Sequence, residues 1–265
     1  PPEEEAEAPR VLAVVASPAR GETSGDGTLV EVTGLRPEEW ASARDRFLFL
    51  SRSGGGEDDD SQKEEEDDEV YATSVGSLLL SARRAGQLYV RGVFVADVAD
   101  AVAGVDVREC RLDRDRAATL RREDLEHLLS AAWVAAIREC ADEKRRARLV
   151  DRYYRVLDRP DAATLIDTRH AAFYVESECA TALAEVWRTA RGPNAVPVSA
   201  ASDGRAALNR LRAASSSSFD IVDASPPLVD VLRSSPGLVE TPSMLLKALD
   251  DAAEEKRDEA DVACP

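Results

Sequence analysis

The stretch Gly76-Ser-Leu-Leu-Leu-Ser-Ala-Arg-Arg84, followed by Leu88-Tyr-Val-Arg-Gly-Val-Phe-Val95, decides the fold. Its two apolar runs, residues 77–81 and 88–95, are separated by the polar turn at residues 82–87. Short apolar runs bounded by turn-forming residues are typical of strands. We therefore expect the two runs to pair as an antiparallel hairpin.

The residues after this pair continue the sheet and then change to helix. A short helical piece is expected at residues 98–102 and a further strand at residues 105–112. Apolar side chains then recur every three or four residues, which predicts a helix with one continuously apolar face. These side chains are Leu125, Leu128, Leu129, Ala132, Trp133, Ala136, Ile137 and Cys140. A second such stripe consists of Val175, Cys179, Leu183 and Val186. We expect both stripes to pack in the core rather than contact a cofactor.

The last third of the chain alternates strands and helices. Strands are expected at residues 195–199 and 219–223, and helices at residues 203–213, 227–234 and 242–256. Ser202 or Asp203 would cap the first of these helices. Strand, helix, strand and helix in this order indicate a small parallel α/β unit beginning near Gly192. The expected fold class is therefore α/β, with an α+β sheet and its helices preceding this unit.

The N-terminal part contains two Val-rich runs, residues 11–16 and 28–33, which we interpret as strands. A helix should begin at Pro37, which suits a first helical turn. Residues 57–69 hold ten acidic residues and one lysine, and so contribute −9 of the net charge of −17. Such a block of like charge cannot collapse onto a core, so we expect residues 53–69 to be a disordered surface insertion.

Charge and cysteine usage exclude several classes of function. A net charge of −17 disfavours attraction to nucleic acid or to an anionic membrane, which requires clustered Lys and Arg. Four widely spaced cysteines, Cys110, Cys140, Cys179 and Cys264, form no zinc signature, so no metal site is expected. Cysteines within apolar patterns indicate a reducing, cytoplasmic compartment. The chain begins with Pro-Pro instead of Met, and we expect it to be a fragment.

No complete catalytic motif is present in the sequence. The patterns G-x-S-x-G, H-E-x-x-H and G-x-x-x-x-G-K-[ST] are all missing. His127 and His170 fall in separate elements, and a partly exposed position on a helix accounts for His127. Gly21, Gly25 and Gly27 precede Thr28, but this loop leads into a strand instead of a helix N-terminus, so a simple turn is favoured over a phosphate cradle.

The segment Arg111-Leu112-Asp113-Arg114-Asp115-Arg116 has two interpretations. Alternating arginines and aspartates can form ion pairs on the surface, which contribute little to stability. Alternatively, one arginine reaches a phosphate, because the planar guanidinium stays charged and binds phosphate oxygens through two hydrogen bonds. The composition alone favours the ion pairs.

The stretch from Gly76 to Val95 resembles the middle segment of the ninety-kilodalton heat-shock chaperones, which belong to the GHKL ATPases. In that family a further strand and loop carry an arginine to the terminal phosphate of ATP held by the preceding domain. Residues 104–116 are similar to that strand and loop. The resemblance places the arginine at Arg116, although Asp115 and Ala117 replace the usual flanking Ser and Glu. Arg114 remains an alternative.

Two other parts of the chain extend the resemblance. Residues 219–223 followed by residues 226–232 are similar to the strand and helix that end the same middle segment. Residues 27–32, together with residues 46–48, resemble the exit of the nucleotide domain in mismatch-repair ATPases, where a Gly-Thr pair closes the nucleotide pocket. Gly27 and Thr28 would be the corresponding cofactor-binding pair here.

The family's Asn and Glu for magnesium, and its Asp-x-Gly-x-Gly motif for adenine, do not occur in the required order. The resemblance therefore implies that ATP with magnesium is bound mainly by an upstream domain, and that this chain alone binds no cofactor. An arginine that stabilises transferred charge acts only with such a partner.

The resemblance implies four segments. These are residues 1–52, the end of a nucleotide-domain-like region with a linker helix; 53–69, the acidic insertion; 70–191, a transducer-like α+β domain with long helices; and 192–265, the small α/β unit with an acidic tail. The implied function is that of the transducer of a chaperone-type ATPase. Its implied partners are the upstream nucleotide-binding domain, client proteins and a second copy of the parent. The alternative is a catalytically inert interaction scaffold with the same fold.

Overall fold

The computed structural model describes residues 13–18, 28–33, 36–48, 70–108, 121–214, 219–235 and 242–262. The chain divides into two units, Pro1–Gly55 and Gly56–Pro265. The expected acidic insertion lies outside the described residues. Helices predominate, and they accompany one mixed sheet and one small parallel sheet, so the expected α/β class is confirmed. Within the described ranges, no helix is both long and apolar enough to cross a bilayer.

The first unit contains a strand pair and one helix. Strands β1 (Ala13–Pro18) and β2 (Thr28–Thr33) are antiparallel. The expected strand at residues 11–16 thus begins two residues later, and the strand at residues 28–33 is confirmed. Helix α1 (Pro37–Asp45) begins at the expected proline. The backbone N–H of Arg36 donates to the Glu39 carboxylate at 2.8 Å, which satisfies a donor at the free helix end.

The second unit is built on a five-stranded mixed sheet. Its strands are β3 (Val70–Ala72), β4 (Gly76–Leu79), β5 (Gln87–Val90), β6 (Val93–Asp97) and β7 (Gly104–Val107). Their order across the sheet is β3-β4-β7-β5-β6. Strand β7 is central, antiparallel to β4 on one side and parallel to β5 on the other.

The expected hairpin between residues 77–81 and 88–95 is wrong. Strand β7 lies between β4 and β5, and the 3-10 helix η1 (Ala82–Arg84) connects these two strands. The hairpin is instead within residues 88–95, where Arg91 and Gly92 adopt φ values of 52° and 77° and turn the chain between β5 and β6. The apolar pattern identified the strand residues, but it did not reveal this two-residue turn.

The expected helical piece at residues 98–102 is also wrong. Asp100 has a φ of 62°, and the backbone N–H groups of Val102 and Ala103 donate to the Asp167 carboxylate instead of to a helical carbonyl. Gly104 then enters β7 so close to η1 that a Cβ there would lie 2.2 Å from the Arg84 carbonyl oxygen. A turn that ends on a glycine therefore replaces the helix.

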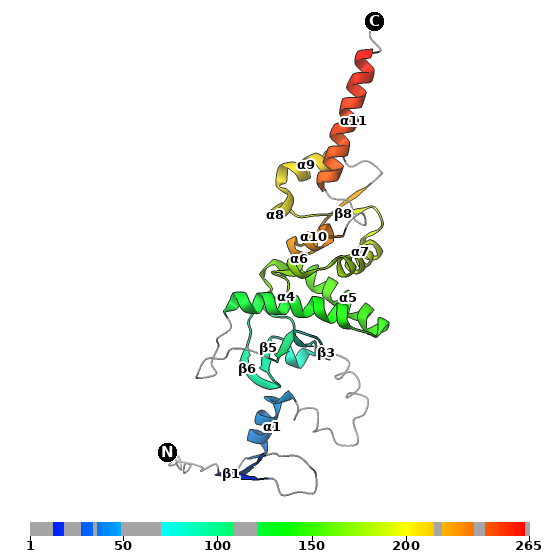
Figure 1. Ribbon diagram of the computed structural model, residues 1–265. Helices are drawn as coiled ribbons and strands as arrows, with labels where there is room; N and C mark the ends of the chain where they lie inside the picture. Colours follow the sequence, from blue (N-terminus) through cyan, green and yellow to red (C-terminus); the bar gives the residue numbers. More distant parts are fainter. Residues whose placement is uncertain are drawn as a thin grey trace, which may run out of the picture. The chain divides into compact units, whose positions relative to one another are not determined.

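Helices cover the sheet and form the largest part of the core. Figure 1 shows α4 (Arg122–Glu139) lying across the sheet, with α5 (Glu143–Leu157) beside it. Beyond them lie α6 (Ala171–Tyr174), α7 (Ser177–Arg191) and α10 (Pro226–Arg233). The predicted apolar stripe of α4 is buried, and its Trp133 ring stacks on Tyr153 of α5 at 4.8 Å. The stripe predicted from Val175 to Val186 lies largely on α7.

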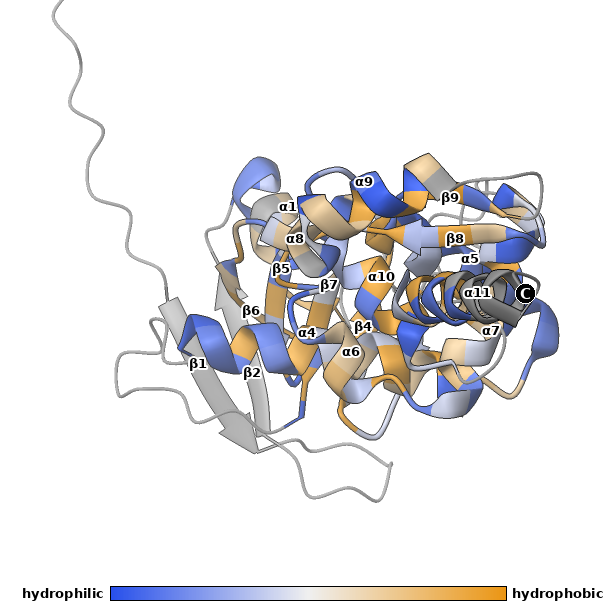
Figure 2. Ribbon diagram, turned by 90° about the horizontal axis from the view of Figure 1, so that it is seen from above, coloured by the Kyte–Doolittle hydropathy of each residue, from blue (hydrophilic) through white to orange (hydrophobic). Residues whose placement is uncertain are grey.

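The C-terminal part is the expected parallel α/β unit. Strands β8 (Ala195–Val198) and β9 (Asp220–Asp223) are parallel. Helix α11 (Pro242–Val262) is the last described element. The helix expected at residues 203–213 is α9 (Arg205–Ala214), and a short unpredicted helix, α8 (Ala200–Asp203), precedes it; Gly204, with a φ of 78°, separates the two. Ser199 caps α8 by accepting from the Ala201 N–H, and the cap expected for α9 at Ser202 or Asp203 stays a prediction. Figure 2 shows that α10 is largely apolar and that α9 and α11 carry hydrophilic residues; Leu228, Val231 and Leu232 of α10 pack in the main core.

Candidate functional site

Three of the four residues predicted to contact nucleotide cannot be placed in the fold, and the role of the fourth, Thr28, stays a prediction. Arg114, Arg116 and Gly27 lie outside the described residues. Thr28 is the first residue of β2, and its backbone is paired with that of Pro18. The described residues do define the two ends of the segment that carries Arg114 and Arg116, because this segment joins the end of β7 to the start of α4.

The first end is fixed by the turn between β5 and β6. The backbone N–H of Arg91 donates to the Val107 carbonyl at 2.9 Å, and its side-chain Nε donates to the Arg108 carbonyl at 2.9 Å. The backbone N–H of Gly92 donates to the Asp106 carboxylate at 2.8 Å. The last residues of the central strand are therefore held from the neighbouring hairpin as well as by the sheet.

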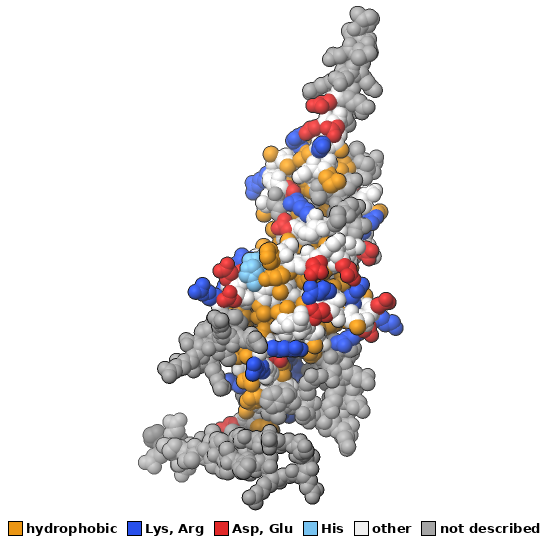
Figure 3. All heavy atoms as spheres, in the orientation of Figure 1, with side chains coloured by type: hydrophobic (Ala, Val, Ile, Leu, Met, Phe, Trp, Pro, Cys, Tyr) orange, Lys and Arg blue, Asp and Glu red, His pale blue; other side chains and the backbone are white. Residues whose placement is uncertain are grey.

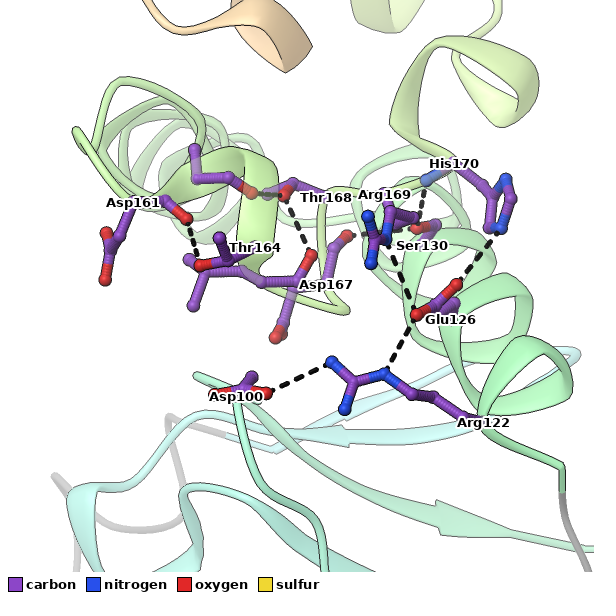
Figure 4. A network of polar contacts seen from close by, with 12 residues as sticks. Asp100, Arg122, Glu126, Ser130, Asp161, Thr164, Asp167, Thr168, Arg169 and His170 are labelled. Atoms are coloured by element: carbon purple, nitrogen blue, oxygen red, sulfur yellow. Dashed lines mark hydrogen bonds and ion pairs between the residues drawn. The ribbon is translucent and has the colours of Figure 1, made fainter.

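The second end is fixed by Arg122, the first residue of α4. Its guanidinium lies 3.1 Å from an Asp100 carboxylate oxygen and 3.2 Å from Glu126 Oε1 (Figure 4). Hydrogen bonds to Asp100 and then to Glu126 raise the pKa of Arg122 above its ordinary value. Because the guanidinium is exposed, we expect these pairs to orient the helix start more than to stabilise the fold.

Two arginines and one histidine meet at the Glu126 carboxylate. This residue is only 8% exposed, although it is charged. Besides Arg122, its carboxylate lies 3.5 Å from Arg169 Nε and 3.6 Å from His170 Nε2 (Figure 4). A buried carboxylate requires such partners, so Glu126 joins α4 to the segment that precedes α6.

The two histidines of the chain form a stack beside Glu126. The rings of His127 and His170 are 3.7 Å apart and 7° from parallel. His127 Nδ1 lies 3.1 Å from the Tyr174 hydroxyl, and the edge of its ring faces Phe173, which is 77% exposed. The two histidines lie in separate elements, as expected, but their contact was not predicted. Their spacing of 43 residues carries no periodic signal that could have revealed it.

Asp167 is the buried centre of a second polar network. Its carboxylate accepts hydrogen bonds from Trp133 Nε1 at 2.9 Å, Val102 N–H at 2.8 Å and Ala103 N–H at 3.1 Å. Burial raises its pKa, and the three donors oppose that shift only in part. The carbonyl oxygen of Asp167 also accepts from the Ser130 hydroxyl at 3.1 Å (Figure 4). This residue therefore connects the β6–β7 loop, α4 and the segment before α6.

The chemistry available to these side chains is limited. Ser130 is fully buried, and its hydroxyl is occupied by Asp167 and by the backbone N–H of His170. Burial raises the pKa of the Cys179 thiol to about 12, so it holds no reactive thiolate at neutral pH.

Metal binding finds no support in the described part of the chain, which contains no group of three His, Cys, Asp or Glu side chains that could hold an ion. The two imidazoles cannot chelate one ion together, because their lone pairs lie in parallel planes 3.7 Å apart. Glu126, Asp167 and the two histidines therefore connect elements of the fold, and their arrangement matches no reaction centre.

Comparisons of the chain with protein families, with curated proteins and with solved structures find no match. The functional argument therefore rests on the residues and on their arrangement.

Proposed function

We propose that this chain is the transducer, or middle, segment of a GHKL-type ATPase most like the ninety-kilodalton heat-shock chaperones. It couples ATP binding in an N-terminal nucleotide domain to conformational change or to binding of a client protein. ATP and magnesium are held mainly by that domain, and Gly27 and Thr28 close the pocket. The parent acts in the cytoplasm as a homodimeric chaperone, without nucleic acid or membrane as a partner.

The observation that carries this proposal is the central position of β7. The strand lies between β4 and β5, and in the sequence the residues Arg114 and Arg116 fall between the end of β7 and the start of α4. An arginine that approaches the terminal phosphate stabilises the transferred charge, and the attraction pulls on the segment that carries it. A segment attached to the middle of a sheet and to a long helix would transmit that pull to both.

Both ends of the segment that carries Arg114 and Arg116 are held in place, so a pull on this segment would move β7 and α4 rather than be absorbed within the segment. Arg91 holds the last residues of β7, and Arg122 holds the first turn of α4 through Asp100 and Glu126. At the other side of α4, Trp133 and Ser130 bond to Asp167. Because packed helices move as rigid bodies, displacement of α4 would reach α6 and α7 and, through α10, the β8–β9 unit.

The proposal is tested by ATP turnover of the full-length parent carrying Arg116→Ala or Arg114→Ala. If one arginine contacts the terminal phosphate, its loss is expected to lower turnover by about 10³-fold or more, with little effect on nucleotide affinity. Arg155→Ala is the matched control, because this exposed side chain of α5 pairs with Asp151 of the same helix. Unchanged turnover in both test variants would contradict the proposal and favour the inert scaffold.

A further inference from the structure

We propose that the acidic segment at residues 57–69 of this chain docks on a basic stripe of helix α5. The stripe consists of Lys144, Arg148 and Arg152. Their spacing of four residues places the three side chains on one face of the helix. Figure 3 shows basic side chains at the surface at the level of α5 in Figure 1. The proposal does not depend on the ATPase function.

The stripe points away from the core, because the other face of α5 is apolar and buried. The buried side chains of that face are Leu149, Val150, Tyr153, Tyr154, Val156 and Leu157. Lys144 and Arg148 are exposed. Arg152 is half-buried, since its guanidinium donates to the Leu80 carbonyl just after β4. The stripe therefore lies at the surface beside one edge of the five-stranded sheet.

Helix α5 is basic, although the chain as a whole is strongly acidic. It holds six Lys or Arg residues and two acids, which gives a net charge of +4 against −17 for the chain. Asp151 pairs with Arg155 at 2.7 Å, and Glu178 of α7 pairs with Arg146 at 3.1 Å. Asp142 caps the helix through a backbone N–H at 2.8 Å. Even with Asp142 and Glu178 counted, the helix keeps an excess of positive charge.

The strands beside α5 contribute no charge, and the segment that leads into them is strongly negative. Residues 70–80, which include β3, β4 and the turn between them, contain no Asp, Glu, Lys or Arg. Residues 57–69 contain ten acids and one lysine. Charge complementarity therefore favours this segment as the occupant of the stripe.

Strand β3 fixes the point at which the acidic segment joins the described fold. Residue 69 is followed directly by Val70, the first residue of β3. The Arg145 guanidinium donates to the Val70 carbonyl at 3.1 Å and lies 5.0 Å from the centre of the Tyr71 ring. Because Arg145 is the neighbour of Lys144 on α5, the segment is attached beside the start of the stripe.

The segment is long enough to cover the stripe, and its attachment favours it over a separate partner. From Lys144 to Arg152 helix α5 rises about 12 Å. The thirteen residues 57–69 span up to about 43 Å when extended. A tethered ligand acts at an effective concentration on the order of millimolar, so ion pairs that are weak singly act together. A separate acidic or phosphate-bearing molecule has to displace the segment before it binds the stripe.

Zero-length crosslinking of this chain with a carbodiimide tests the contact, because the reagent joins a lysine only to a carboxylate that touches it. The chain has four lysines, which are Lys63, Lys144, Lys247 and Lys256. We expect mass spectrometry to find Lys144 joined to acids of residues 57–69 within one chain. The yield should fall by at least about tenfold at 1 M NaCl, where the Debye length is about 3 Å. Exposed Lys247 of α11 is the internal control and should not form this link.

Two charge reversals decide whether the stripe is responsible. Arg148→Glu places an acid inside the stripe and should lower the Lys144 yield by about fivefold, because attraction becomes repulsion. Arg188→Glu makes the same change of net charge at an exposed position of α7 and should leave the yield unchanged. Absence of the Lys144 link at low salt, an equal yield from Lys247, or an equal effect of both reversals would overturn the proposal. So would links that form only between copies, which a mixture of isotope-labelled and unlabelled chains identifies.

Binding of a separate polyanion gives a second measurement. Replacement of the ten acids of residues 57–69 by Asn and Gln should uncover the stripe. Fluorescent poly-glutamate should then bind at least about tenfold more tightly than to the natural chain, because it no longer competes with a tethered segment. Arg148→Glu added to this variant should remove the gain, and a gain that persists would overturn the proposal.

Discussion

Replacement of Asp167 by alanine should destabilise the second unit more than any surface substitution near it. The carboxylate is the acceptor for three donors, Trp133 Nε1, Val102 N–H and Ala103 N–H. All three donors would lose their acceptor inside the core. An orphaned buried donor costs about 1–3 kcal/mol, so the loss of the acceptor for three donors in Asp167→Ala should lower the free energy of unfolding by roughly 3–9 kcal/mol.

Urea unfolding followed by circular dichroism measures this loss. Asp161→Ala is the matched control, because Asp161 lies in the same segment and pairs with Arg159 at the surface. Exposed ion pairs contribute about 0–1 kcal/mol, so the control should unfold close to the natural chain. A loss below about 1 kcal/mol for Asp167→Ala would refute the view that this carboxylate organises the network.

The same residue gives a pH dependence whose sign follows from its raised pKa. Burial makes the pKa of Asp167 higher in the folded chain than its ordinary value of 3.8. Its contribution to stability is therefore fully present below that value and is lost as pH rises through the folded pKa. Asp167→Asn removes this titration, so the stability difference between the natural chain and the variant should widen toward acidic pH. A difference that is constant with pH would contradict the assignment.

Two further predictions concern packing and thiol chemistry. Gly104→Ala should lower the free energy of unfolding by about 1–3 kcal/mol, because the new Cβ would lie 2.2 Å from the Arg84 carbonyl oxygen. A loss below about 1 kcal/mol in urea unfolding would contradict the clash. In the native chain iodoacetamide should modify half-buried Cys140 before buried Cys179, whose pKa is raised to about 12, and mass spectrometry showing the reverse order would contradict this.

The sequence predicted the elements of this fold better than their pairing. Regular spacing revealed the buried face of α4, and the alternation of strands and helices revealed the parallel pair β8 and β9, because both signals are local. Strand partners are not local. Strand β7 lies between β4 and β5, and the turn at Arg91 and Gly92 divides the stretch 88–95 that was expected to be one strand.

The polar clusters could not be predicted for the same reason. Asp167 accepts hydrogen bonds from residues 34 and 65 positions away along the chain, and such contacts leave no periodic trace. The sequence shows only that the chain has two histidines, His127 and His170; the contact between their rings is visible only in the fold. The roles of Arg114, Arg116, Gly27 and Thr28 stay predictions from the resemblance.

The proposed function requires that ATP binding in the upstream domain is coupled to α4, and amide hydrogen exchange of the full-length parent tests this coupling most directly. Exchange at residues 104–108 and 122–139 would be compared with and without a non-hydrolysable ATP analogue. The account predicts that the analogue slows exchange in both regions, and that the double variant Arg114→Ala, Arg116→Ala loses this response while still binding the analogue. Identical exchange with and without the analogue in the unmodified parent would contradict it.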